Sequence, residues 1–185
     1  PSYRNLCAVI LSRIGEYERS SRIYAQLLHE YPANAKVWLG YGHVLKTEGR
    51  QEQCIDAYRR SVSQDPASGE AYWSLANLKT FRFTAADLEA MRKALADPKL
   101  DDASRVHLHF ALGKAHEDAG EYAPSFEHYA QGNALHRSRE RYDADQNTAR
   151  ARKLGSVFTR EFFAARSGSR ALSRSKVMAV EVILR

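Results

Sequence analysis

Residues 35–66 read AKVWLGYGHVLKTEGRQEQCIDAYRRSVSQDP, and this stretch decides the fold that we expect for the chain. Apolar and small side chains recur at helical spacing over residues 36–47 and again over residues 51–64. Gly49 interrupts the first pattern, and Pro66 ends the second because proline cannot continue a helix. The stretch therefore predicts two short antiparallel helices joined by a tight turn.

The two helices are expected to cross at Gly42 and Cys54, where small side chains let the backbones approach. Such a pair buries too little surface to be stable alone, so it must stack on copies of itself. A first copy lies at an offset of about 34 residues towards the N-terminus. The offset pairs Cys7 with Tyr41, Leu11 with Leu45, Gly15 with Gly49, Tyr24 with Tyr58 and Pro32 with Pro66.

Two further copies follow towards the C-terminus. In the third, Ala76 aligns with Gly42, but residues 81–83 (Phe-Arg-Phe) stand near the place of the turn glycine, and Thr84 is the expected N-cap of the next helix. This copy is therefore degenerate. The fourth is regular again and places Leu112, Gly113, His116, Gly120, Ser125 and Tyr129 at the positions of Tyr41, Gly42, Leu45, Gly49, Cys54 and Tyr58.

In the spacing of these recurring residues, the chain resembles the tetratricopeptide repeat (TPR) family over roughly its first 140 residues. The resemblance implies an all-α fold, a right-handed α-solenoid with at least eight helices and no sheet in residues 1–165. One of these helices is expected near 69–80. We expect TPR 1 at 1–34, TPR 2 at 35–68, a degenerate TPR 3 at 69–102, TPR 4 at 103–138, a single capping helix over 139–166, and a basic tail with an apolar, strand-like end at 167–185.

The net charge of +6 is unevenly distributed along the chain. Residues 1–136 hold 16 Lys and Arg against 17 Asp and Glu, whereas residues 137–185 hold 12 against 5. The repeats therefore offer no general phosphate-binding surface. The basic C-terminal stretch has few interleaved aromatic residues, so we interpret it as a solvated helix face and expect no nucleic-acid partner.

Other classes of function find little support in the sequence. No run of apolar residues is long enough for a membrane span, and we expect a cytoplasmic protein that does not bind membranes. Cys7 and Cys54 occupy packing positions, which favours reduced thiols. His109 and His116 also occupy packing positions, and no metal site, cofactor or catalytic residue is expected.

A second resemblance covers residues 108–137, LHFALGKAHEDAGEYAPSFEHYAQGNALHR. This run is similar to the last repeat of bacterial proteins in which TPRs precede a sulfotransferase domain. In that family a strand and a glycine-containing loop of the form PRSGTT come next, and the loop binds the 5′-phosphosulfate of the sulfonate donor (PAPS). Residues 177–184 could supply the strand, but the chain ends without the loop, so the resemblance implies no donor-binding residue here.

The TPR resemblance also implies a concave groove, lined by the first helix of each repeat, that takes a peptide or a partner segment. A mixture of cations and aromatic residues suits an acidic or carboxylate-bearing peptide with an apolar anchor. By register the groove residues are Asn5, Val9, Arg13, Lys36, Leu39, His43, Lys46, Trp73, Asn77, Thr80, Phe110, Lys114 and Glu117.

Two functions therefore stay open at this point. The first is a non-enzymatic protein-interaction module that binds a peptide in the groove. The second is a substrate-positioning region in front of a PAPS-dependent sulfotransferase domain. The apolar run at 177–184 must be covered in water, so we also expect it to pack on a repeat surface or to form a homodimer through the tail.

Overall fold

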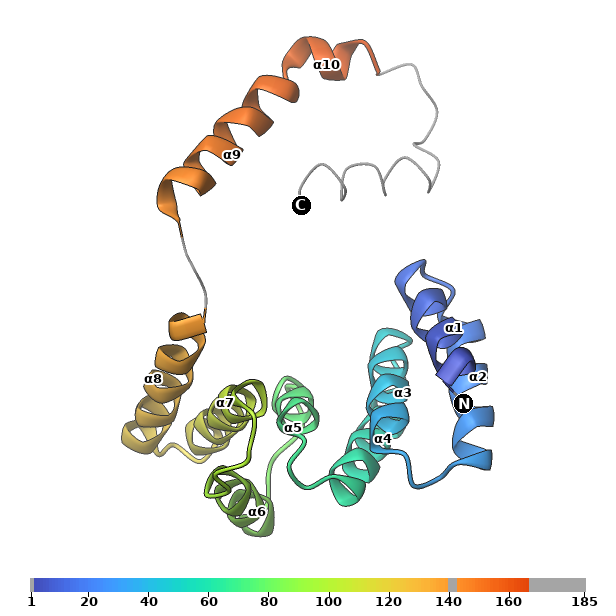
Figure 1. The fold of residues 1–185 in the computed structure, drawn as a ribbon, viewed down its shortest axis with the longest axis vertical. Coiled ribbons are helices and arrows are strands. Elements are labelled where there is room, and N and C mark those ends of the chain that lie inside the picture. The colour runs from blue at the N-terminus through green and yellow to red at the C-terminus, as the bar shows by residue number, and fades with distance from the viewer. Residues whose placement is uncertain (1, 140–142, 167–185) are drawn as a thin grey trace. The chain divides into compact units, whose positions relative to one another are not determined.

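A computed structural model describes residues 2–139 and 143–166. Within these ranges the fold is all-helical, with ten helices and no strand, which confirms the predicted fold class (Figure 1). None of these helices is long and apolar enough to cross a membrane. The helices are α1 (Ser2–Arg13), α2 (Tyr17–Glu30), α3 (Ala35–Thr47), α4 (Gln51–Gln64), α5 (Gly69–Ala76), α6 (Ala85–Leu95), α7 (Asp102–Asp118), α8 (Tyr122–Arg139), α9 (Ala144–Val157) and α10 (Arg160–Ala164).

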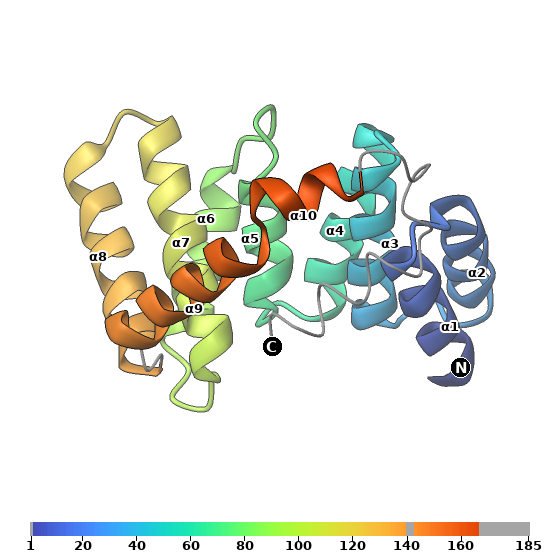
Figure 2. The ribbon, with the colours of Figure 1, turned by 90° about the horizontal axis from the view of Figure 1, so that it is seen from above.

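The chain divides into two compact units, residues 1–140 and 141–185. In the first unit each helix packs on its neighbours in turn: α1 on α2, α2 on α3, α3 on α4, α4 on α5, α5 on α7 and α7 on α8. Figure 2 shows this chain-order stack from α1 to α8. Helices α3, α5 and α7 lie along one side of the stack, and α4 and α6 lie along the other (Figure 1).

Three turns within the stack depend on glycine. Gly15, Gly49 and Gly120 have φ angles of 84°, 77° and 76°, in the left-handed region that side chains disfavour. These are the turn glycines expected from the repeat, and each follows a first helix: α1, α3 or α7. The backbone therefore confirms the repeat register in the first, second and fourth copies.

The helix crossing also follows the predicted pattern. A Cβ atom added to Gly42 would lie 2.5 Å from Cδ1 of Tyr58, and one added to Gly113 would lie 2.7 Å from Cδ1 of Tyr129. In both copies a tyrosine of the second helix thus packs directly on the glycine of the first. The glycines are required because any larger side chain would separate the helices.

A hydroxyl group fixes the same crossing in two copies. Ser20 Oγ donates to the carbonyl of Ala8 at 2.7 Å, and Ser125 Oγ donates to the carbonyl of Gly113 at 2.8 Å. Cys54 stands at the equivalent position in the second copy and is fully buried. Both helices of each pair are therefore tied together at their point of closest approach.

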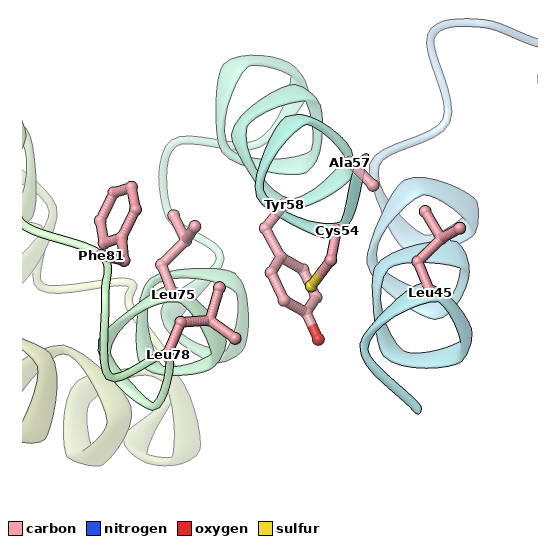
Figure 3. Close-up of a cluster of buried hydrophobic side chains, with 7 residues drawn as sticks. All are labelled: Leu45, Cys54, Ala57, Tyr58, Leu75, Leu78 and Phe81. Carbon is pink, nitrogen blue, oxygen red and sulfur yellow. The ribbon is translucent and has the colours of Figure 1, made fainter. Parts of the chain in front are cut away.

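Apolar packing continues from one repeat into the next. Tyr58 of α4 lies between Leu45 of α3 and Leu75 of α5 (Figure 3). These side chains are fully buried and belong to one cluster with Cys54 and Phe81. Since the cluster draws on three helices, the second repeat is stabilised by the third as well as by its own pair.

The third copy departs from the expected helix over residues 69–80. Helix α5 ends at Ala76, and Asn77 caps it by bonding to carbonyls of α5. The expected N-cap is confirmed: Thr84 Oγ1 accepts from the backbone N–H of Asp87, and the Asp87 carboxylate accepts from the backbone N–H of Thr84. Helix α6 packs on α7. Met91 of α6 is buried in one cluster with residues of α5 and of α7, so the second helix of this copy packs on its own repeat and on the following one.

The second unit has two helices where we expected a single one over 139–166. Helix α9 ends at Val157, and Phe158 leaves helical geometry. Thr159 then caps α10 by accepting a hydrogen bond from the backbone N–H of Phe162 at 3.2 Å. A strong N-cap residue explains why the helix restarts there. The strand-like run and tail dimer predicted for 167–185 lie outside the described residues.

Candidate functional site

The first helices of the repeats carry the candidate groove residues at equivalent positions. Trp73 of α5 and Phe110 of α7 are half-buried, with ring centroids 5.4 Å apart. Tyr129 of α8 extends this contact, at 6.3 Å from Phe110. We call these three side chains the aromatic row. Leu39 occupies the corresponding place on α3, where it is half-buried against the neighbouring core cluster.

A line of polar groups accompanies the aromatic row. His43 Nδ1 lies 2.9 Å from the Tyr58 hydroxyl, and His43 Nε2 lies 3.4 Å from Oε1 of Glu70 on α5. The contact with His43 holds the pKa of Glu70 below its usual value, and His107 acts in the same direction. Burial lowers the pKa of His107. Glu70 is thus an ionised carboxylate in contact with His43 at neutral pH.

Two of the predicted groove residues, Lys114 and His43, already contact carboxylates within the molecule. Lys114 Nζ lies 2.5 Å from Asp118 Oδ1 and 3.7 Å from Glu117 Oε1. His43 faces the Glu70 carboxylate. Tyr129 donates to the other oxygen of Glu117, Oε2, at 2.8 Å. The charge available to an acidic partner therefore comes chiefly from the exposed residues Arg13, Lys36 and Lys46.

Two open pockets bring several predicted residues together. The first, of about 360 Å³, lies between the first repeat and α3, and Val9, Arg13 and His43 line it. The second, of about 230 Å³, lies at the turn end of α3 and α5, and Lys46, Asn77 and Thr80 belong to its lining. Lys79 adds a further cation to the second pocket. The two pockets lie in different repeat pairs, so a ligand that used both would have to be extended.

The remaining predicted residues are placed differently. Asn5 is half-buried and Lys36 is exposed, and both lie outside these two pockets. Asn77 is the C-cap of α5, and its Nδ2 donates to the Trp73 carbonyl at 3.0 Å. That bond orients the amide towards the helix end. Asn77 therefore has less freedom to bind a ligand than an asparagine within a helix face.

Sequence reasoning missed three residues of this surface. Glu70 and His107 stand at the position of Lys36 in the third and fourth copies, so the repeat register could have found them. His107 also lines a pocket of about 350 Å³ with residues of α8. Tyr129 was missed because it lies on a second helix, whereas the register assigned the groove to first helices. Its signal was the recurrence of tyrosine at Tyr24, Tyr58 and Tyr129.

Among solved structures, "MamA RS-1 ArsTM double mutant" is similar over 77% of this chain and 78% of that chain, with a TM-score of 0.53 and 21% identity. "MamA 41-end from Desulfovibrio magneticus RS-1" is similar over 76% and 77%, with a TM-score of 0.53 and 21% identity. At this identity the likeness shows a shared fold. No curated protein matches the chain.

A family model supplies the most specific match. The model described as "Tetratricopeptide repeat" matches residues 35–68, the boundaries expected for the second copy. Neither this match nor the solved structures bear on the resemblance of residues 108–137 to TPR-containing sulfotransferases, which stays a prediction, and nothing in them points to catalysis. The family match and the stacked helix pairs together identify residues 35–68 as a tetratricopeptide repeat within a solenoid of TPR-like helical pairs.

Proposed function

We propose that the repeat unit is a protein-interaction module that binds an extended peptide segment along its first helices. The aromatic row carries this proposal. Trp73, Phe110 and Tyr129 keep part of their surface accessible although α5 packs on α7 and α7 packs on α8. Aromatic side chains, tryptophan and tyrosine above all, are enriched among the residues that dominate binding energy at protein interfaces.

The chemistry of the surface defines the segment that it would bind. An apolar or aromatic anchor would lie on Trp73 and Phe110. An acidic residue towards the first or second repeat would meet Lys46 or Arg13, which make no ion pair among the described residues. An acidic residue next to Glu70 would be repelled. The preferred segment therefore has its anchor at α5–α7 and its negative charge towards α1–α3.

A selection from a random peptide library on the full chain tests this proposal. We expect enriched peptides that share one aromatic or large aliphatic residue and an acidic residue on one side of it. Trp73→Ala should weaken the selected peptides at least about tenfold, as loss of an anchor does. Tyr31→Ala is the matched control, because Tyr31 is an exposed aromatic residue in a connection outside the first helices.

Charge reversal tests the orientation of the peptide. Lys46→Glu should weaken acidic peptides and spare variants in which the acidic residue is replaced by glutamine. Equal binding to the wild-type chain and Trp73→Ala, with both proteins folded by circular dichroism, would contradict the proposed site. Enrichment of peptides without any anchor residue would contradict it as well.

A further inference from the structure

A cluster of three histidines joins the last two helices of the repeat unit, on residues that the groove does not use. His109 Nδ1 of α7 lies 3.1 Å from His128 Nδ1 of α8. The rings of His116 and His128 are stacked, with centroids 5.6 Å apart and planes inclined by 8°. His109 and His116 are buried, at 8% and 5% exposure, and His128 is half-buried.

Charged groups surround this cluster from each helix that packs against it. Arg92 of α6 places Nη2 3.5 Å from His116 Nε2, and Arg105 of α7 acts on His109. Glu121, just before α8, places Oε2 2.5 Å from His116 Nδ1, and Glu127 of α8 acts on His128. Glu70, the acidic residue of α5, faces His43 and His107 instead. Glu121 contacts His116, while Arg105 disfavours a positive charge on His109 and Arg92 disfavours one on His128.

The contact between His109 and His128 limits how many protons the cluster can hold. In a hydrogen bond between two imidazoles, one nitrogen donates and the other accepts. A protonated imidazole carries N–H groups on both nitrogens, so two protonated rings would direct N–H groups at each other. Burial lowers the pKa of His109 and of His128; His128 lowers that of His109 further, and His116 lowers that of His128 further. Both rings therefore stay neutral near pH 7.

We propose that His109, His116 and His128 form an acid-sensitive latch, which holds α8 on α7 when the rings are neutral and releases α8 when the cluster is protonated. The geometry links the latch to the aromatic row. Tyr129 follows His128 directly, and Gly132, one turn later, packs against His109 and Phe110. Release of α8 would withdraw Tyr129 from Phe110. This last consequence, an acid-weakened groove, rests on the proposed function.

The direction of the pH effect follows from proton linkage. A histidine whose pKa is lower in the folded state binds its proton more readily once the helix is released. The stabilisation of α8 is therefore complete above the unfolded value of about 6.5. It is lost as the pH falls below that value. Each additional proton taken up on release changes the opening equilibrium by up to about tenfold per pH unit.

Hydrogen exchange of the full chain at pH 7.5 and pH 5.5, without any peptide, tests the latch. After correction for intrinsic exchange, we expect the protection of amides in α8 to fall by about tenfold or more at the lower pH. Amides of α3 and α4 should keep theirs. A double variant, His109→Gln with His128→Gln, should show no such pH dependence in α8. His29→Gln on α2, an exposed histidine, is the matched control and should behave as the wild type.

Imidazole titration by NMR keeps the test decisive if the double variant does not fold. We expect His109 and His128 of the wild type to titrate below the ordinary imidazole value of about 6.5. Unchanged protection of α8 at pH 5.5, or titration of His109 and His128 at or above that value, would overturn the latch. Since neither measurement uses a peptide, these results are independent of whether the groove binds one. Conversely, a latch that fails leaves peptide binding at pH 7.5 intact.

Discussion

The second and third repeats of this chain connect and pack their two helices differently. In α3–α4, the turn at Gly49 folds the second helix back onto the first, and Gly42 receives Tyr58. In α5–α6, residues 77–84 replace the tight turn, and α6 packs on α7. The two repeats therefore differ in how their helices are connected, by a tight glycine turn in the second and by residues 77–84 in the third.

A different set of interactions holds α6 in place. Asp87 is nearly buried, caps its own helix through Thr84, and forms a two-pronged ion pair with Arg59 of α4. Arg59 also lies 4.9 Å above the ring of Phe81. The third repeat is thus stabilised by a polar connection to the second repeat and by apolar packing of Met91 with residues of α5 and α7. The stability of the third repeat should depend on the ion pair between Arg59 and Asp87. The stability of α3–α4 should depend on the close packing of Tyr58 on Gly42.

Replacing Gly42 with leucine should have the largest effect, because it disrupts the shape-dependent pair. A Cβ atom there already overlaps the Tyr58 ring, so the two helices must separate. We expect the free energy of unfolding to fall by about 3 kcal/mol, as overpacking of a core does. Urea denaturation measures this change. Gly155→Ala on α9, where a Cβ atom meets nothing within 4 Å, is the control and should cost nothing. An unchanged midpoint for Gly42→Leu would show that the crossing is looser than the structure has it.

Replacing Asp87 with alanine should have the next largest effect, because it removes the connection that holds α6. The change removes a helix cap and leaves Arg59 without its partner, at a cost of about 2 kcal/mol. Hydrogen exchange should show that amide protection is lost in α6 before it is lost in α3 and α4. Asp56→Ala, which breaks the exposed ion pair with Arg60, should cost less than about 0.5 kcal/mol. Equal effects of the two changes would mean that α6 is held by packing alone.

Replacing Gly49 with alanine should cost about 1 kcal/mol. Nothing lies within 4 Å of the added methyl group, so the cost is purely the left-handed backbone, with φ at 77°. Thermal unfolding of the variant measures it. Gly120→Ala makes the same change in the turn between α7 and α8, and it should reduce the stability by a similar amount. A large difference between the two turns would show that the repeats do not share one turn geometry.

The smallest effect is the pH dependence that Asp87 contributes. Burial raises its pKa, but hydrogen bonds from Arg59 and Thr84 outweigh burial and leave the pKa below its usual value. A carboxyl group with a lowered folded pKa stabilises the fold above the unfolded value of about 3.9. The stability difference between wild type and Asp87→Asn should therefore narrow as the pH falls below 4, measured by urea denaturation. A constant difference down to pH 2.5 would contradict the ionised pair.

The repeat period predicted much of this fold because it depends on few residues with strict requirements. A left-handed turn needs Gly15, Gly49 or Gly120, and a close crossing needs Gly42 or Gly113, so these positions are readable from the sequence. The early end of α5 and the break between α9 and α10 were not predicted. Both ends are set by whether a capping group stops the helix or the helix continues. The spacing of apolar residues does not indicate which of the two occurs.

The candidate site was predictable in its positions but not in its charges. Register placed Trp73 and Phe110 on the same surface, and the structure brings their rings together. The compensation of Lys114 by Asp118 depends on side-chain geometry within one turn of α7. The approach of His128 to His109 depends on how α8 is rotated against α7. Neither distance follows from a period shared by all repeats.

The reactivity of Cys54, at the crossing of α3 and α4, reports how often the helices of the second repeat separate. Where two other copies have a serine, Cys54 has no exposed surface, and burial raises the pKa of its thiol. A thiol reagent can attack it only during moments when the two helices part, whereas Cys7 keeps part of its surface open at all times. The rate at which Cys54 is alkylated therefore measures the opening of this one repeat within the stack. No label has to be introduced into the protein.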